Sequence, residues 1–139
     1  MVKVGKRNIF ETLKQIFNLN IFPTLLRFFL IHQNPFLAIF NETFSRGKYP
    51  KIMYLKNNIK IKLYSVFDLS TLNLVFCRGD YYKPRNIKLV LDIGSNIGIT
   101  CLYWMHNNPD CKVFSYEPST RNYKRLLYNT KKFKKKYNL

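Results

Sequence analysis

Apolar positions recur with a helical period in the first third of the chain. Between residues 8 and 44 they are spaced by three and four, as at Ile9 and Leu13, which predicts short amphipathic helices. Pro23 and Pro35 suit the first turns of two further helices. Basic residues flank the aromatic clusters of this region, so it has two interpretations. We favour an apolar stripe that packs on the neighbouring domain over one that lies on a membrane surface.

The period of the pattern changes to two after residue 50. Apolar residues and lysines alternate along 59–63, and the apolar and aromatic residues of 52–56 precede them, so the two segments predict a pair of β-strands. Asn57 and Asn58 separate the two segments, and asparagine tolerates the positive φ that a two-residue hairpin turn requires. We therefore expect a β-hairpin at this position.

A third pattern begins near residue 86. Residues 88–93 form a nearly continuous apolar run, which predicts a strand buried on both faces. A loop with a glycine at each end and an apolar helix over 99–105 follow. After them come a second buried strand over 112–117 and a helix opened by Pro118 and Ser119. This order of elements predicts a parallel sheet with a helical crossover, and therefore an α/β fold.

The three patterns divide the chain into three regions within one domain. Residues 1–50 are expected to be a helical N-terminal region. Residues 51–85 are expected to contain the hairpin and a short helix capped by Asp68 or Ser70. Residues 86–139 are expected to form the β-α-β-α unit, which carries the candidate chemistry.

The loop after the first parallel strand has the residues of a nucleotide pocket. Gly94 and Gly98 let the backbone approach a ligand closely, and Gly98 also lets the helix pack near the strand. Asp92 ends the strand, where it can accept hydrogen bonds from an amine-bearing ligand. Glu117 ends the next strand, where its two oxygens can accept both hydroxyls of a ribose. Asn96 lies where a pyrophosphate needs bare backbone, so a nicotinamide dinucleotide is disfavoured. The alternative is a tight turn without a ligand.

These segments resemble a known family. Leu91–Gly98, Val113–Ser119 and Asn122 are similar to the FkbM-type S-adenosylmethionine-dependent methyltransferases, whose first motif is typically Asp-x-Gly-Ala-Asn-x-Gly. Ser95 stands here in place of the alanine. The resemblance implies an incomplete Rossmann-like class I methyltransferase sheet preceded by short helices and a β-hairpin. It also implies methyl transfer to an oxygen of a glycan, lipid or metabolite.

The resemblance further implies that S-adenosyl-L-methionine is the cofactor. The residues expected to bind it are Asp92, Gly94, Ser95, Asn96, Gly98, Glu117 and Tyr81. In this scheme Glu117 holds the ribose, Asp92 faces the amino group, and Tyr81 is a lid residue. Only 22 residues follow Glu117, so no catalytic base can be named. We expect the chain to be the cofactor-binding portion of such an enzyme, completed by a C-terminal half or an oligomer.

The charge of the chain supports a second hypothesis. The formal net charge is +17, which is typical of proteins that bind RNA or an anionic membrane. The second hypothesis is therefore a non-catalytic basic binding module. Codons rich in A and T are an alternative explanation for the many lysines. Residues 121–139 contain eight cations interleaved with aromatic side chains that are suited to stacking on bases. We favour a solvated helix end for this tail.

Cysteines and hydropathy bear on the cellular setting. Cys77, Cys101 and Cys111 lack the spacing of a disulfide framework or a zinc site, so we expect reduced core residues and a cytoplasmic protein. No metal ligand set is expected. The longest uncharged stretch near the N-terminus has 12 residues, against about 20 for a membrane span. A peripheral membrane contact through residues 8–44 stays open.

Overall fold

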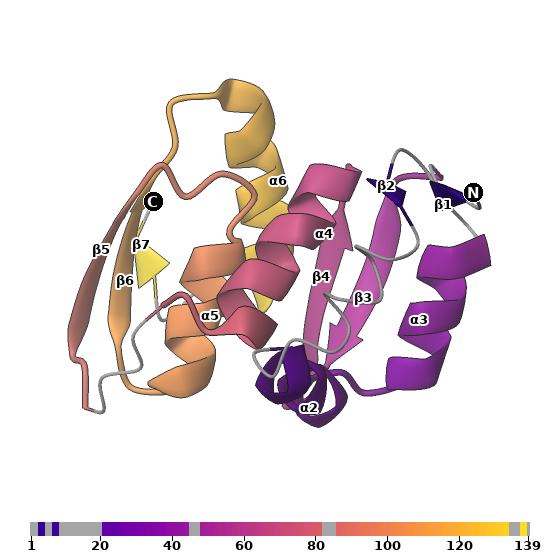
Figure 1. The fold of residues 1–139 in the computed structure, drawn as a ribbon. Coiled ribbons are helices and arrows are strands. Elements are labelled where there is room, and N and C mark those ends of the chain that lie inside the picture. The colour runs from indigo at the N-terminus through magenta and orange to yellow at the C-terminus, as the bar shows by residue number, and fades with distance from the viewer. Residues whose placement is uncertain are drawn as a thin grey trace.

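The chain has a mixed α/β structure (Figure 1). The computed structural model describes residues 3–4, 7–8, 21–44, 48–81, 86–133 and 137–138. The helices are α2 (Ile21–Ile31), α3 (Pro35–Phe44), α4 (Val66–Asn73) with the π-helix η1 (Leu74–Arg78), α5 (Ile99–Asn107), α6 (Thr120–Thr130) and the 3₁₀ helix η2 (Lys131–Phe133). The strands are β1 (Lys3–Val4), β2 (Arg7–Asn8), β3 (Lys51–Leu55), β4 (Ile59–Leu63), β5 (Leu89–Ile93), β6 (Lys112–Tyr116) and β7 (Tyr137–Asn138).

Two of the helices expected in the N-terminal region, those at Pro23 and Pro35, are confirmed. Pro23 lies in the first turn of α2 and Pro35 begins α3, as expected for residues that need no backbone N–H there. The helix expected around Ile9 and Leu13 falls outside the described residues. The short β1–β2 pair is an element that the helical pattern did not predict.

The hairpin is confirmed, with a different turn. β3 and β4 pair antiparallel, and Leu55 opposes Ile59, so the turn contains Lys56, Asn57 and Asn58. Both asparagines have the expected positive φ, at 59° and 58°. The backbone N–H of Lys56, just after the strand, donates to the carbonyl of Ile31 at the end of α2, at 2.8 Å.

The short helix after the hairpin begins earlier than expected. Ser65 is its N-cap, and the Ser65 side chain accepts a hydrogen bond from the backbone N–H of Asp68 at 3.2 Å. Neither Asp68 nor Ser70 caps the helix. The Asp68 carboxylate instead accepts the backbone N–H of Tyr64 at 2.7 Å. Ser65 therefore takes the role because Asp68 already lies in the first turn.

The β-α-β-α unit is confirmed as a parallel arrangement. β5 and β6 pair parallel with Leu89 opposite Lys112 and Ile93 opposite Tyr116. α5 connects them, and Ser119 caps α6 by accepting the backbone N–H of Asn122. β7 adds a short parallel strand on the far side of β6, which the pattern did not predict. Glu117 and the glycine loop therefore lie at the same edge of the sheet.

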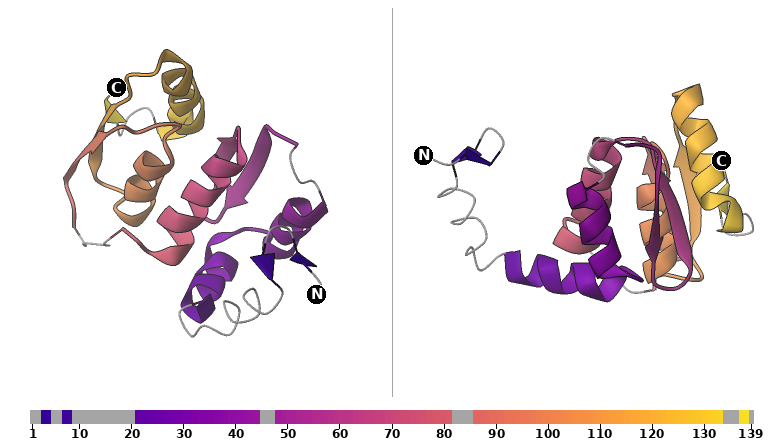
Figure 2. Two further views of the ribbon diagram at one scale, coloured as in Figure 1. Left: turned by 45° about the horizontal axis from the view of Figure 1, so that its top comes forward. Right: turned by 90° about the vertical axis from the view of Figure 1, so that its right-hand side faces the viewer.

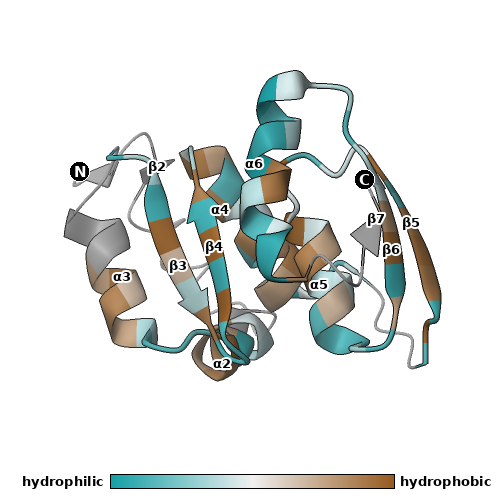
Figure 3. Cartoon of the chain, turned by 180° about the vertical axis from the view of Figure 1, so that it is seen from behind, coloured by the Kyte–Doolittle hydropathy of each residue, from teal (hydrophilic) through white to brown (hydrophobic). Residues whose placement is uncertain are grey.

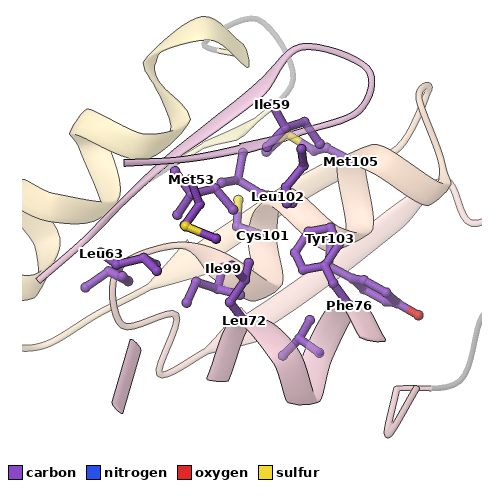
Figure 4. Packing of buried hydrophobic residues seen from close by; sticks show 14 of the residues in the cluster. Met53, Ile59, Leu63, Leu72, Phe76, Ile99, Cys101, Leu102, Tyr103 and Met105 are labelled. Carbon is purple, nitrogen blue, oxygen red and sulfur yellow. The ribbon is translucent and has the colours of Figure 1, made fainter. Parts of the chain in front are cut away.

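The hydrophobic core lies between the hairpin, α4 with η1, and α5 (Figure 4). Leu63 from β4, Phe76 from η1 and Tyr103 from α5 are fully buried members. The Phe76 and Tyr103 rings meet edge to face, with their centroids 5.4 Å apart. The core thus fixes α5, whose N-terminus follows the glycine loop.

The expected burial of the first parallel strand is wrong. Leu89, Leu91 and Ile93 are 61–77% exposed, and Tyr116 on β6 is exposed beside them. Their side chains share one face because alternate residues of a strand point the same way. Among the described residues only the opposite face is covered, where α5 packs, and only β6 pairs with β5. An apolar strand needs both faces covered to become fully buried.

Candidate functional site

The glycine loop has three left-handed residues. Gly94, Asn96 and Gly98 have φ values of 78°, 49° and 88°. The Ser95 hydroxyl is buried and donates to the carbonyl of Asp92 at 2.7 Å. The Gly98 N–H donates to the Ser95 carbonyl at 2.8 Å. The loop is therefore held in one conformation by its own backbone and by Ser95.

Glu117 connects the loop to the end of β6. Its Oε2 accepts the backbone N–H of Asn96 at 2.8 Å, and its Oε1 accepts that of Ser119 at 2.9 Å. The N–H groups of Gly94 and Ser95 both donate to the carbonyl of Tyr116, at 2.8 and 3.1 Å. The structure thus brings the two sequence motifs together, as the parallel arrangement predicts.

Asp92 lies at the junction of β5 and α5. It is half-buried, and its Oδ2 accepts the hydroxyl of Thr100 in the first turn of α5 at 2.7 Å. The N-terminus of α5 contributes positive potential next to this carboxylate. Asp92 is therefore held by Thr100 at the carboxyl end of β5, beside the loop.

The two loop glycines have different surroundings. A Cβ on Gly98 would lie 3.2 Å from the Thr130 Cγ2 and 3.4 Å from the Leu126 Cγ, so this glycine lets α6 pack on the loop. A Cβ on Gly94 would meet no atom within 4 Å. The space in front of Gly94 is therefore open, and a ligand can approach its backbone there.

Asn129 is the residue of this site whose role the sequence did not reveal. It is buried in α6, and its Oδ1 accepts the backbone N–H of Lys62 at 2.8 Å. Its Nδ2 donates to the carbonyl of Ile97 at 2.9 Å and to that of Lys62 at 3.2 Å. Asn129 thereby joins the hairpin to the glycine loop. The available signal was that Leu126 and Asn129 match the Leu-x-x-Asn pattern common in the corresponding helix of the FkbM-type enzymes that the motifs resemble.

Tyr81 lies apart from the loop. Its ring packs on those of Tyr103 and Trp104 in α5, with centroids 5.9 and 6.2 Å away, and its carbonyl accepts the Tyr103 hydroxyl at 3.1 Å. Tyr103 and Trp104 lie in the middle of α5, whereas the loop precedes its first turn. A lid role for Tyr81 stays a prediction.

The cysteines are buried thiols, as expected for core residues. Cys101 lies in α5 behind the site, and burial raises the pKa of its thiol to about 12. A thiol with such a pKa stays protonated at neutral pH and is a poor nucleophile. Cys101 is therefore a packing residue. None of the helices in the described ranges is long and apolar enough to cross a bilayer.

Aromatic side chains near the basic tail are covered by cations of the chain itself. The ammonium groups of Lys62 and Lys131 lie over the Tyr128 ring, at 5.2 and 4.5 Å from its centroid. The Arg125 guanidinium lies 4.2 Å from the centroid of Tyr64. Such contacts compete with the stacking of nucleic-acid bases on these rings. The choice between a solvated helix end and an RNA site stays a prediction.

No protein-family model matches the chain, and a search of curated proteins finds no match either.

Proposed function

We propose that the chain is the cofactor-binding portion of an S-adenosylmethionine-dependent methyltransferase of the FkbM type. The observation that carries the proposal is the position of Glu117, whose carboxylate is held between Asn96 of the glycine loop and Ser119 of the next helix. The motif that ends β6 and the motif that follows β5 thus form one pocket edge. The reducing, cytoplasmic setting expected from the three cysteines belongs to the same proposal.

The residues fit this cofactor. Each oxygen of Glu117 accepts one backbone N–H, and a carboxylate has about four acceptor positions, so two are left for ribose hydroxyls. The open space before Gly94 accommodates the methionine part against bare backbone. Asp92, fixed by Thr100, lies where it can accept the amino group. Ser95 and Asn96 support the pocket by setting the loop conformation.

The chemistry of such a cofactor sets what the protein has to do. A bound S-adenosylmethionine supplies an electrophilic methyl group on a sulfonium, which needs little activation. The task of the pocket is then to hold the cofactor so that an acceptor hydroxyl lies in line with the methyl carbon. The acceptor belongs to a glycan, a lipid or a metabolite under this proposal. Among the described residues only β6 pairs with β5, so further strands that carry the acceptor site can add to the other edge of β5.

Calorimetric titration with S-adenosylhomocysteine tests the proposal on the full chain. We expect binding by the wild-type protein and at least a tenfold loss of affinity in Glu117→Ala, because the ribose loses both of its acceptors. Asp110→Ala is the matched control, since it removes the same charge from an exposed loop at the other end of β6. Circular dichroism establishes that both variants are folded. Equal affinities of Glu117→Ala and wild type would contradict the proposal, as would the absence of any binding.

A further inference from the structure

α2 and α3 present a continuous apolar surface to solvent. Its side chains are 38–76% exposed: Phe22, Leu25, Leu26, Phe29, Leu30, Phe36 and Leu37. We call this set the α2–α3 surface. The rings of Phe29 and Phe36 meet edge to face at 5.5 Å, so the two helices form one patch. Figure 3 shows hydrophobic residues along both helices.

The α2–α3 surface is separate from the side of α2 that packs on the protein. Phe28 and Ile31 pack against the core, and the Arg27 guanidinium donates to the carbonyl of Arg78 at 2.8 Å. The inward side thus already attaches α2 to η1 and provides the packing expected of an apolar stripe. α2 has apolar side chains on its outward side as well, and burial against the core does not account for them.

The area of the α2–α3 surface exceeds what an ordinary monomer exposes. Seven side chains of about 200 Å² each, a little over half exposed, give an area on the order of 800 Å². The largest apolar patch of a typical monomer is roughly 300–600 Å². A surface of this size therefore marks a docking site.

The charge around the α2–α3 surface is positive. Between residues 12 and 67 the chain has eight lysines and arginines and a single acid, Glu42. Lys56 is exposed beside the last residue of α2, where its N–H donates to the carbonyl of Ile31. The Lys60 ammonium lies over the ring of Tyr54, which shares a hollow with Leu37 of α3. Cations thus adjoin the apolar patch.

We propose that the α2–α3 surface docks on an anionic lipid bilayer. Phenylalanine and leucine on short helices, with lysines at the margin, are the composition of helices that lie in a membrane interface. A protein interface of this area carries several hydrogen bonds, about one per 100–200 Å². The seven side chains have no hydrogen-bonding group, and a bilayer requires none. The lysines then pair with lipid phosphates and carboxylates.

Docking in this way leaves the candidate cofactor site accessible. α3 and the sheet of β5, β6 and β7 lie at opposite ends of the molecule (Figure 1). The left-hand view of Figure 2 shows the same separation of α3 from the sheet. The inference rests on α2, α3 and the lysines of the adjoining hairpin, so it holds whether or not the chain binds S-adenosylmethionine.

Vesicle co-sedimentation of the full chain tests the inference. The probes are vesicles of phosphatidylcholine alone and vesicles in which phosphatidylserine replaces about three in ten lipids. We expect binding to the second kind, weakened by salt, and at least a tenfold loss in the double variant Leu26→Glu with Phe36→Glu. The matched control is Leu89→Glu with Leu91→Glu, which changes the charge equally on exposed leucines of the sheet. This control is expected to bind like the wild type.

Three results would overturn the inference. The first is that the wild-type protein does not bind anionic vesicles. The second is that the Leu26→Glu, Phe36→Glu variant binds them as well as the wild type does. The third is that the Leu89→Glu, Leu91→Glu control loses as much affinity as the Leu26→Glu, Phe36→Glu variant. Hydrogen exchange of the wild-type protein gives an independent measurement if a variant does not fold. Vesicles are expected to slow exchange in α2 and α3 and leave β5 unchanged, and unchanged exchange in α2 and α3 would count against docking. Capture of a protein partner without vesicle binding would replace the bilayer with that partner.

Discussion

Asn129 offers the sharpest test of how the structure is held together. Its side chain is 4% exposed and makes three hydrogen bonds to backbone groups of Lys62 and Ile97. Replacing it with leucine, which has a similar size, removes all three and leaves one N–H and two carbonyls without that partner. The change therefore separates hydrogen bonding from the volume of the side chain.

The expected loss of stability follows from these contacts. At about 1 kcal/mol of net stabilisation per hydrogen bond, Asn129→Leu is expected to lower the free energy of unfolding by about 3 kcal/mol. A domain of this size has a stability of about 5–15 kcal/mol, so the loss is a large fraction of the total. At roughly 3–4 °C per kcal/mol the melting temperature falls by about 10 °C.

Urea unfolding followed by circular dichroism measures the change. Asn122→Leu is the control, because it makes the same substitution near the start of α6, where Asn122 is half-exposed. We expect the control to change the free energy of unfolding by less than about 1 kcal/mol. If Asn129→Leu loses no more than the control, the hydrogen bonds to Lys62 and Ile97 do not stabilise the fold and the reasoning is wrong.

Three further predictions concern pH, the glycines and the thiols. Burial lowers the pKa of His32 from 6.5 to about 4, so the unfolded chain takes up a proton before the folded chain does as the pH falls. The free energy of unfolding is therefore expected to decrease by up to about 3 kcal/mol between pH 6.5 and pH 4. His32→Gln should flatten the dependence of urea midpoints on pH, and an unchanged slope would refute this. Gly94→Ala should weaken the binding of S-adenosylhomocysteine at least tenfold. It should lower the melting temperature less than Gly98→Ala does, because the new Cβ at position 98 meets Thr130. The reverse order of melting temperatures would contradict the packing described. Thiol-specific reagents should leave Cys101 unmodified at pH 8 until urea unfolds the protein, whereas fast labelling of the native protein would show that it is accessible.

Local signals predicted much of the fold. The two asparagines at 57 and 58 indicated the hairpin because few other residues accept a positive φ, and both adopt it. Pro35 and Ser119 marked the helix starts because their preferences act within one turn. The order of the elements likewise predicted the parallel pairing of β5 with β6.

Features that depend on distant contacts were not predictable from the pattern. The hydrogen bond from Lys56, just after the strand end at Leu55, to α2 joins segments that no local rule relates. The exposure of Leu91 follows from which elements cover the sheet, and the hydropathy of the strand does not report this. The role of Asn129 requires knowing that α6 lies against β4.

The candidate site shows the same division. Glu117 and the loop glycines were located from spacing, because the ends of parallel strands meet at one edge. The sequence predicted that Gly98 allows close packing of a helix, but it did not show that this helix is α6, nor that the space in front of Gly94 is open.

The hydrogen bonds between Lys62 and Asn129 have a consequence for synthesis of the chain. The two residues are separated by 67 positions, and a ribosome adds about 5–20 residues per second. The outer edge of β4 therefore waits roughly 3–13 s after it is made before α6 exists to cover it. During that time the nascent hairpin can pair with strands of other nascent chains. Slow codons between β4 and α6 are then expected to increase aggregation during expression, and fast ones to reduce it.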